Sequence, residues 1–140
     1  MPNRAAACDS WVANGRMYPM SDRTGIKGGI ELRAYSQVLK RHVVLTRETW
    51  LVHILPRHSE LKGKLHLIKQ IIEESGSDIL RYRRKSNPME MAFFLKCEHF
   101  QPYNTHLKLA LKIISDSEAI VTTAEGYFGR HIPPLGMEQL

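Results

Sequence analysis

The strongest constraint on the fold is a segment, residues 106–113, in which apolar and polar residues alternate one by one. Its apolar members are Leu107, Leu109, Leu111 and Ile113. A repeat of two residues is that of a β-strand, because successive side chains of a strand point to opposite faces of the sheet. The alternation therefore predicts a strand with one buried face, and it places Lys108 and Lys112 on the opposite, open face.

The residues before this region have the period of a helix instead. Thr46 is a suitable N-cap, Glu48 follows in the first turn, and Pro56 ends this first helix because proline lacks an N–H. A second helix is expected between Ser59 and Gly76, with an apolar stripe at helical spacing. The stripe consists of Leu61, Leu65, Ile68, Ile71 and Ile72.

Further short runs are compatible with strands, and they define the expected fold. These runs are residues 43–45, 79–84, 91–97 and 119–124, whereas residues 30–40 fit a helix and a strand equally poorly. Helices followed by consecutive strands with short turns indicate an α+β fold. We expect N-terminal helices packed on one face of a three- to five-stranded antiparallel sheet. The expected organisation is an N-terminal arm or partly ordered extension over residues 1–40, a folded domain over 41–132 and a C-terminal tail over 133–140.

Composition limits the class of protein and of partner. The chain has 140 residues, 43% of them apolar, which is ordinary for one folded domain. Its formal net charge of +6 favours a polyanionic partner, with nucleic acid ahead of an anionic membrane. No apolar run approaches the roughly 20 residues that span a bilayer, and residues 1–7 lack the apolar region of a secretory signal. Because its two cysteines, Cys8 and Cys97, do not make a disulfide framework, the expected location is a reducing cytoplasm.

The residues around Pro56 are suited to cleaving a phosphodiester without a metal. His53 and His58 can take and give protons near neutral pH, and Arg57 can hold a phosphate. Arg57 and His58 follow the proline at the break between the two expected helices, where loop side chains can project into a cleft. A backbone carbonyl that accepts from the His53 ring would explain that residue equally well. Glu60 is explained by a helix start alone, because the helix dipole favours a carboxylate there.

A second group of residues is suited to binding nucleic acid. Cations crowd residues 81–85 and repel one another unless an anion or solvent screens them. Either Arg81 and Arg83, or Tyr82 and Arg84, lie on the open face, because a register shift of one residue reverses the assignment. Lysines and threonines on strands are also ordinary surface and strand-forming residues. The candidate nucleic-acid-binding residues are Arg81, Arg83, Arg84, Lys96, Lys108, Thr122, Tyr127 and Arg130.

A zinc site is the alternative use of the histidines. His53, His58, Cys97 and His99 could supply four ligands if their elements converge. However, the first two are separated by Pro56 and lack the i, i+4 spacing of a metalloprotease helix. We therefore expect no metal and no cofactor.

The order of these motifs resembles a known group of proteins. Residues 44–61 read VLTRETWLVHILPRHSEL, and an amphipathic helix, a basic strand and a terminal strand with Thr122 and Thr123 follow. Over residues 42–130 this pattern is similar to the phage- and mobile-element-associated nuclease domains of the barnase/EndoU/colicin/RelE superfamily. Ser59 stands where these domains usually have a proline.

The resemblance implies a metal-independent ribonuclease that acts as a toxin or effector in the host cytoplasm and is blocked by a protein inhibitor. The 2′-hydroxyl of an RNA such as tRNA would attack the adjacent phosphate and leave a 2′,3′-cyclic phosphate. His53 or His58 would act as general base and acid, and Arg57 with Arg81 or Arg83 would stabilise the phosphorane charge. Fold does not determine function. The alternatives are a non-catalytic protein on the same fold that binds nucleic acid or a host protein, as a phage accessory or anti-defence protein, and a phage structural or packaging accessory.

Overall fold

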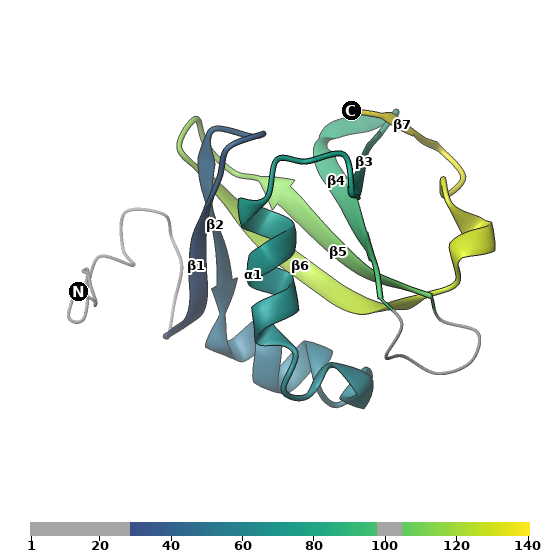
Figure 1. Ribbon diagram of the computed structural model, residues 1–140. Helices are drawn as coiled ribbons and strands as arrows, with labels where there is room; N and C mark the ends of the chain where they lie inside the picture. Colours follow the sequence, from purple (N-terminus) through teal and green to yellow (C-terminus); the bar gives the residue numbers. More distant parts are fainter. Residues whose placement is uncertain (1–28, 98–104) are drawn as a thin grey trace. The chain divides into compact units, whose positions relative to one another are not determined.

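Figure 1 shows the computed structural model of the chain, which describes residues 29–97 and 105–140. The fold described below is that of the compact unit Glu31–Leu140, together with Ile30 at the start of its first strand. Within the described ranges, we find no helix that combines the length and the apolar character needed to cross a membrane.

The described residues form one sheet of seven strands. In chain order these are β1 (Ile30–Ser36), β2 (Arg41–Thr46), β3 (Ile79–Arg84), β4 (Asn87–Lys96), β5 (His106–Ile113), β6 (Glu118–Tyr127) and β7 (Met137–Gln139). Their order across the sheet is β1-β2-β6-β5-β4-β3-β7, so β5 is the central strand. The sheet is mixed, because β2 runs parallel to β6, whereas β5 is antiparallel to both its neighbours and β3 is antiparallel to β4 and β7.

The connection from β2 to β3 carries most of the helical structure. It contains a π-helical turn η2 (Thr49–Ile54), a 3-10 turn η3 (Ser59–Leu61) and the helix α1 (Leu65–Glu73), and a further 3-10 turn, η4 (Gly129–His131), follows β6. Figure 1 shows α1 lying across one face of the sheet. We call the opposite side the helix-free face.

The expected fold class is therefore wrong. We predicted N-terminal helices on one face of a three- to five-stranded antiparallel sheet, and the described residues instead form a mixed sheet of seven strands with one α-helix. Local patterns could not reveal the parallel pairing of β2 with β6, because Val43 pairs with Ala119, which is distant in the sequence. They also gave no clear strand signal for the edge strands β1 and β7.

The two predicted helices are shorter than their sequence patterns. Thr46 precedes a helical turn at residues 47–48 that leads into η2, and its hydroxyl oxygen accepts from the backbone N–H of Thr49 at 3.1 Å, as predicted for an N-cap. The second is interrupted by Gly63, whose φ of 77° lies in the left-handed region that favours glycine. The predicted stripe is buried at Leu61 and Ile68, but these residues belong to η3 and α1 rather than to one helix.

The buried face of the sheet is the one that the alternation predicts. Leu107, Leu109 and Leu111 are at most 1% exposed, and they pack in one cluster with Phe93 of β4 and Ile68 of α1. Because side chains alternate along β5, Lys108 and Lys112 point to the helix-free face, as predicted.

The register of β3 against β4 determines which residues of β3 share the helix-free face with Lys108 and Lys112. Arg81 pairs with Phe93 in β4 and so lies on the helix-covered side, whereas Tyr82 pairs with Ala92 on the helix-free face. Phe94 also points to the helix-free face, yet it is fully buried, because the rings of Tyr82 and Tyr127 pack against it at centroid distances of 5.9 and 5.1 Å. This face is therefore partly covered by aromatic rings.

An ion pair between an exposed arginine and a buried glutamate lies where β1, β2 and β6 meet. Arg33 donates to Glu118 at 2.9 Å, and the second carboxylate oxygen of Glu118 has no hydrogen-bond partner among the described residues. His42 pairs with Glu118 across the strands and its ring contacts Tyr35 at a centroid distance of 5.1 Å. Burial raises the pKa of Glu118, and burial followed by the nearby Arg33 charge lowers the pKa of His42.

The shift at His42 makes stability depend on pH. A histidine with a lowered folded-state pKa binds fewer protons when folded, so the free energy of unfolding falls as the pH drops through about 6.5. Between about pH 8 and about pH 5.5 we expect guanidinium unfolding to show a smaller loss of stability in His42→Gln than in the wild type. Because the pKa of Glu118 is raised, its protonation increases the free energy of unfolding as the pH falls, and this contribution is present in both proteins. His66→Gln, at an exposed position of α1, should keep the wild-type slope, and equal slopes for all three proteins would contradict the assignment.

Gly63 and Gly76 form a matched pair for testing the break before α1. A Cβ at either position would meet nothing within 4 Å, but only Gly63 has a positive φ. Gly63→Ala should therefore lower the free energy of unfolding by about 1–2 kcal/mol. Gly76→Ala should leave it unchanged or raise it by up to about 1 kcal/mol. Chemical denaturation measures both, and an equal effect of the two substitutions would refute the role of the left-handed turn.

Candidate functional site

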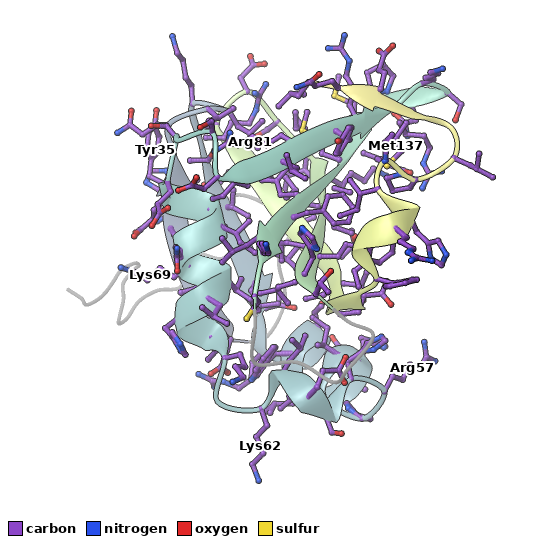
Figure 2. The ribbon with its side chains drawn as sticks, turned by 45° about the vertical axis from the view of Figure 1, so that its right-hand side comes forward. Tyr35, Arg57, Lys62, Lys69, Arg81 and Met137 are labelled. Carbon is purple, nitrogen blue, oxygen red and sulfur yellow. The ribbon has the colours of Figure 1, made fainter. Side chains whose placement is uncertain are left out.

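The three predicted catalytic residues lie on η2 and in the turn after it. His53 and Arg57 are exposed, and Figure 2 shows Arg57 at the lower end of the view, pointing away from the fold. His58 is half-buried, with its Nδ1 atom 3.7 Å from Oε2 of Glu60. Figure 2 shows Arg81 at the upper end. The predicted combination of Arg57 with Arg81 is therefore not brought together.

Glu60 fastens this segment to the sheet. Its Oε2 atom accepts a hydrogen bond from the backbone N–H of Gly126 in β6 at 3.1 Å. The pairing of β2 with β6 ends at Val44 and Ile120, and η3 contacts β6 further along that strand, at Gly126. We predicted that a helix start alone explains Glu60, but its carboxylate connects His58 to Gly126, the residue before Tyr127.

The basic strand β3 finds partners within the chain. Arg81 donates to the backbone oxygens of Glu74 at 2.6 Å and Gly76 at 3.1 Å, and so closes the end of α1. Burial lowers the pKa of Arg81. The other two arginines form ion pairs, Arg83 with Glu138 at 2.9 Å and Arg84 with Glu90 at 2.7 Å. These contacts offset the repulsion from which phosphate binding was inferred.

Three of the other predicted binding residues, Lys96, Lys108 and Tyr127, gather at one end of the helix-free face. Lys96, His106 and Tyr127 are cross-strand neighbours on β4, β5 and β6. The Nζ atom of Lys108 lies 5.1 Å from the ring centroid of Tyr127 and 3.6 Å from Oε2 of Glu125. A cation over an aromatic ring beside an imidazole is therefore built from adjacent strands.

The turn η4 and the residue before it add an imidazole and two further side chains to this end. The ring of His131 lies 6.4 Å from that of Tyr127 and 5.2 Å from that of Phe128, between centroids. The Tyr127 hydroxyl donates to the backbone oxygen of His131 at 3.4 Å, and the Arg130 guanidinium lies 5.9 Å from the Phe128 ring centroid. Thr122, in contrast, is exposed at the irregularity of β6 where the pairing with β5 shifts register.

Burial and neighbouring charges shift the pKa values of His106 and Tyr127, the two central groups of this cluster. Burial, and then the charge of Lys96, lower the pKa of His106 below its usual value. Burial, and then Glu125, raise the pKa of the Tyr127 hydroxyl. His106 is therefore uncharged at neutral pH, and Tyr127 keeps its proton.

Sequence reasoning missed the two imidazoles of this cluster. His106 counted only as a polar position of the alternating strand, and His131 lay in a loop noted for Tyr127 and Arg130. The available signal was position: His106 begins the strand that carries Lys108. Among the described residues, no group of three or more His, Cys, Asp or Glu side chains could hold a metal ion. His99, which the zinc alternative needs, lies outside the described residues.

Comparisons of this chain with protein-family models, with curated proteins and with solved structures find no match. The superfamily resemblance of residues 42–130 thus stays a prediction from the motif.

Removing the Glu60 carboxylate should loosen the attachment of η3 to β6. Glu60→Ala leaves the part-buried N–H of Gly126 without its partner, which costs about 1–3 kcal/mol of unfolding free energy. Glu73→Ala is the matched control, because within residues 29–97 and 105–140 the Glu73 side chain makes one exposed i, i+4 pair, with Lys69, worth at most about 0.5 kcal/mol. Denaturant titrations compare them, and equal losses would show that the Glu60 contact is dispensable.

Proposed function

We propose that this chain binds single-stranded RNA on the helix-free face of its sheet and cleaves it without a metal ion. The observation that carries the proposal is the group formed at the end of β5 and β6 by His106, Lys108, Tyr127 and His131. Imidazoles exchange protons near neutral pH, and a lysine beside them can neutralise charge on a phosphate. An acid, a base and a cation are what RNA cleavage requires when no metal supplies them.

The aromatic side chains support single-stranded RNA as the substrate. Tyr127 and Phe128 are partly exposed and so can stack on unpaired bases. Lys96 and Arg130 are exposed cations in the same region, and the net charge of the chain is +6. Rings for bases and cations for phosphates are the two requirements for holding a single strand.

In the proposed reaction the 2′-oxygen of a ribose bonds to the adjacent phosphorus while the bond from phosphorus to the 5′-oxygen breaks. An imidazole takes the proton of the 2′-hydroxyl, and an acid gives a proton to the departing 5′-oxygen. The products are a 2′,3′-cyclic phosphate and a 5′-hydroxyl. Lys108 stabilises the charge on the phosphorus oxygens.

The proposal also includes His53, Arg57 and His58, the residues that the sequence predicted to be catalytic. His58 is a further candidate for proton transfer, because Glu60 ties its segment to Gly126, next to Tyr127. Roles for His53 and Arg57 rest on the sequence pattern alone.

We further propose that the protein acts in a reducing cytoplasm as a phage or mobile-element toxin or effector, with RNA such as tRNA as target and a protein inhibitor as partner. The motif resemblance of residues 42–130 supports this setting. Cys97, which is free and buried, is compatible with it.

Cleavage in excess chelator is the direct test. We expect the purified chain to cut a single-stranded oligoribonucleotide in EDTA and to leave ends that mass spectrometry identifies as 2′,3′-cyclic phosphates. His106→Ala should lower the rate about 100-fold or more. His66→Ala removes an exposed imidazole from α1 instead and should leave the rate unchanged.

Two results would contradict the proposal. RNA that is bound but never cut would favour the non-catalytic alternative. Equal rates for the His106 and His66 variants would exclude the site at β5 and β6.

One observation favours a second candidate function, the binding of a host protein. Leu51 and Val52 on η2 are 52% and 58% exposed, although both are apolar. Growth arrest on expression discriminates the two functions. Relief by His106→Ala points to RNA cleavage, whereas relief only by Leu51→Ser with Val52→Ser points to protein binding.

A further inference from the structure

Nδ1 of His106 contacts the Thr105 hydroxyl, and this hydroxyl also contacts the backbone N–H of Gly129. The Oγ1 atom of Thr105 lies 2.8 Å from Nδ1 of His106. The same oxygen accepts a hydrogen bond from the backbone N–H of Gly129 at 3.1 Å. The three groups form a short chain from η4 to the start of β5.

The partners available to the Thr105 hydroxyl favour one direction for this chain. Because the Gly129 N–H can only donate, Thr105 Oγ1 accepts from it and keeps a second lone pair and its own proton. The 2.8 Å contact can therefore run from Nδ1–H to Oγ1 or from the hydroxyl to Nδ1, but only the second direction gives the hydroxyl proton an acceptor among the described residues. In that direction Nδ1 accepts, and the proton of the neutral ring resides on Nε2.

The absence of a side chain at Gly129 permits this arrangement. A Cβ there would lie 2.7 Å from Thr105 Oγ1, 2.9 Å from Cε1 of His106 and 3.0 Å from its Nδ1. These separations are shorter than van der Waals contact, so any other residue would displace the threonine or the ring. The close approach explains the glycine, since its φ is not in the left-handed region.

We propose that Thr105 is a positioning residue that fixes His106 in the Nε2–H form, so that His106 donates a hydrogen bond to the scissile phosphate and is not the general base. The inference rests on the proposed function. The proton of the 2′-hydroxyl then passes to another imidazole, and His131, which also contacts the Tyr127 ring, is the one we assign. Because His106 keeps its proton, the departing 5′-oxygen takes a proton from water. A preorganised donor stabilises charge on the phosphate without giving up its proton.

The surroundings of His106 agree with a neutral donor. Lys96 of β4 and Tyr127 of β6 pair with it from either side, and Lys108 follows on its own strand. The charge of Lys96 adds to burial in lowering the pKa of His106. An uncharged ring with a single N–H has one proton to offer, and Thr105 directs it away from Nδ1.

The tautomer can be measured on the free protein. In long-range ¹H–¹⁵N NMR of histidine-labelled protein at alkaline pH, we expect Nδ1 of His106 to resonate as an unprotonated nitrogen and Nε2 as a protonated one. His106→Gln assigns the signals by their loss. Thr105→Val, which keeps the shape but lacks the hydroxyl, should shift the ring toward a mixture of tautomers, and Thr105→Ser should restore the wild-type pattern.

Cleavage kinetics test the role separately. A glutamine amide can donate a hydrogen bond but cannot act as a base, so His106→Gln should retain at least about tenfold more activity than His106→Ala. Thr105→Val should lower kcat while the acidic limb of the pH–rate profile stays in place, because that limb belongs to the base. His131→Gln, in contrast, should remove that limb.

The inference and the proposed function fail in different ways. A wild-type His106 protonated on Nδ1, or a Thr105→Val variant with an unchanged tautomer, overturns the inference even if RNA is cut. A His106→Gln variant as inactive as His106→Ala overturns the donor role. The expected tautomer in a protein that cuts no RNA upholds the positioning by Thr105 and refutes the nuclease proposal.

Discussion

The burial of one face of β5 is the constraint on which the rest of this fold depends. β5 is the central strand, and Leu107, Leu109 and Leu111 are enclosed beneath the helical connection. Burying each leucine contributes roughly 2 kcal/mol. A register shift of one residue would expose all three and bury Lys108 instead. The same alternation that builds the core therefore holds His106 and Lys108 on the opposite face.

The candidate site combines this rigid strand with two less regular segments. β5 supplies His106 and Lys108, and η4 approaches them so closely that Gly129 has no room for a side chain. On the other edge of β6, Glu60 secures η3 through the N–H of Gly126. Side chains from separate parts of the sequence thus meet where β6 ends, and backbone contacts on both sides hold them there.

Features that depend on neighbouring residues were predictable from the sequence. The alternation in β5 and the cap at Thr46 are local, and both predictions are confirmed. Gly63 was visible in the sequence, but the continuing apolar stripe concealed the break it makes before α1.

Features that depend on distant partners were not predictable. The pairing of β2 with β6 turns an expected antiparallel sheet into a mixed one. The partner of Arg83 is Glu138, far along the chain, and Arg84 pairs with Glu90 in the neighbouring strand. A count of local charges cannot reveal that these arginines are neutralised within the fold. The Thr105–His106–Gly129 contact is equally invisible, because its components are ordinary residues until the chain brings them together.

The parallel pairing of β2 with β6 also determines when the protein can finish folding during synthesis. Val43, Val44 and Leu45 are almost completely buried, yet β6 emerges from the ribosome long after them. Until it does, this apolar strand lacks a permanent neighbour on one side, which exposes the nascent chain to aggregation and to chaperones. His106, Tyr127 and His131 are translated in the same late portion of the chain. The candidate site consequently forms only after β6 and η4 have been made and the sheet closes.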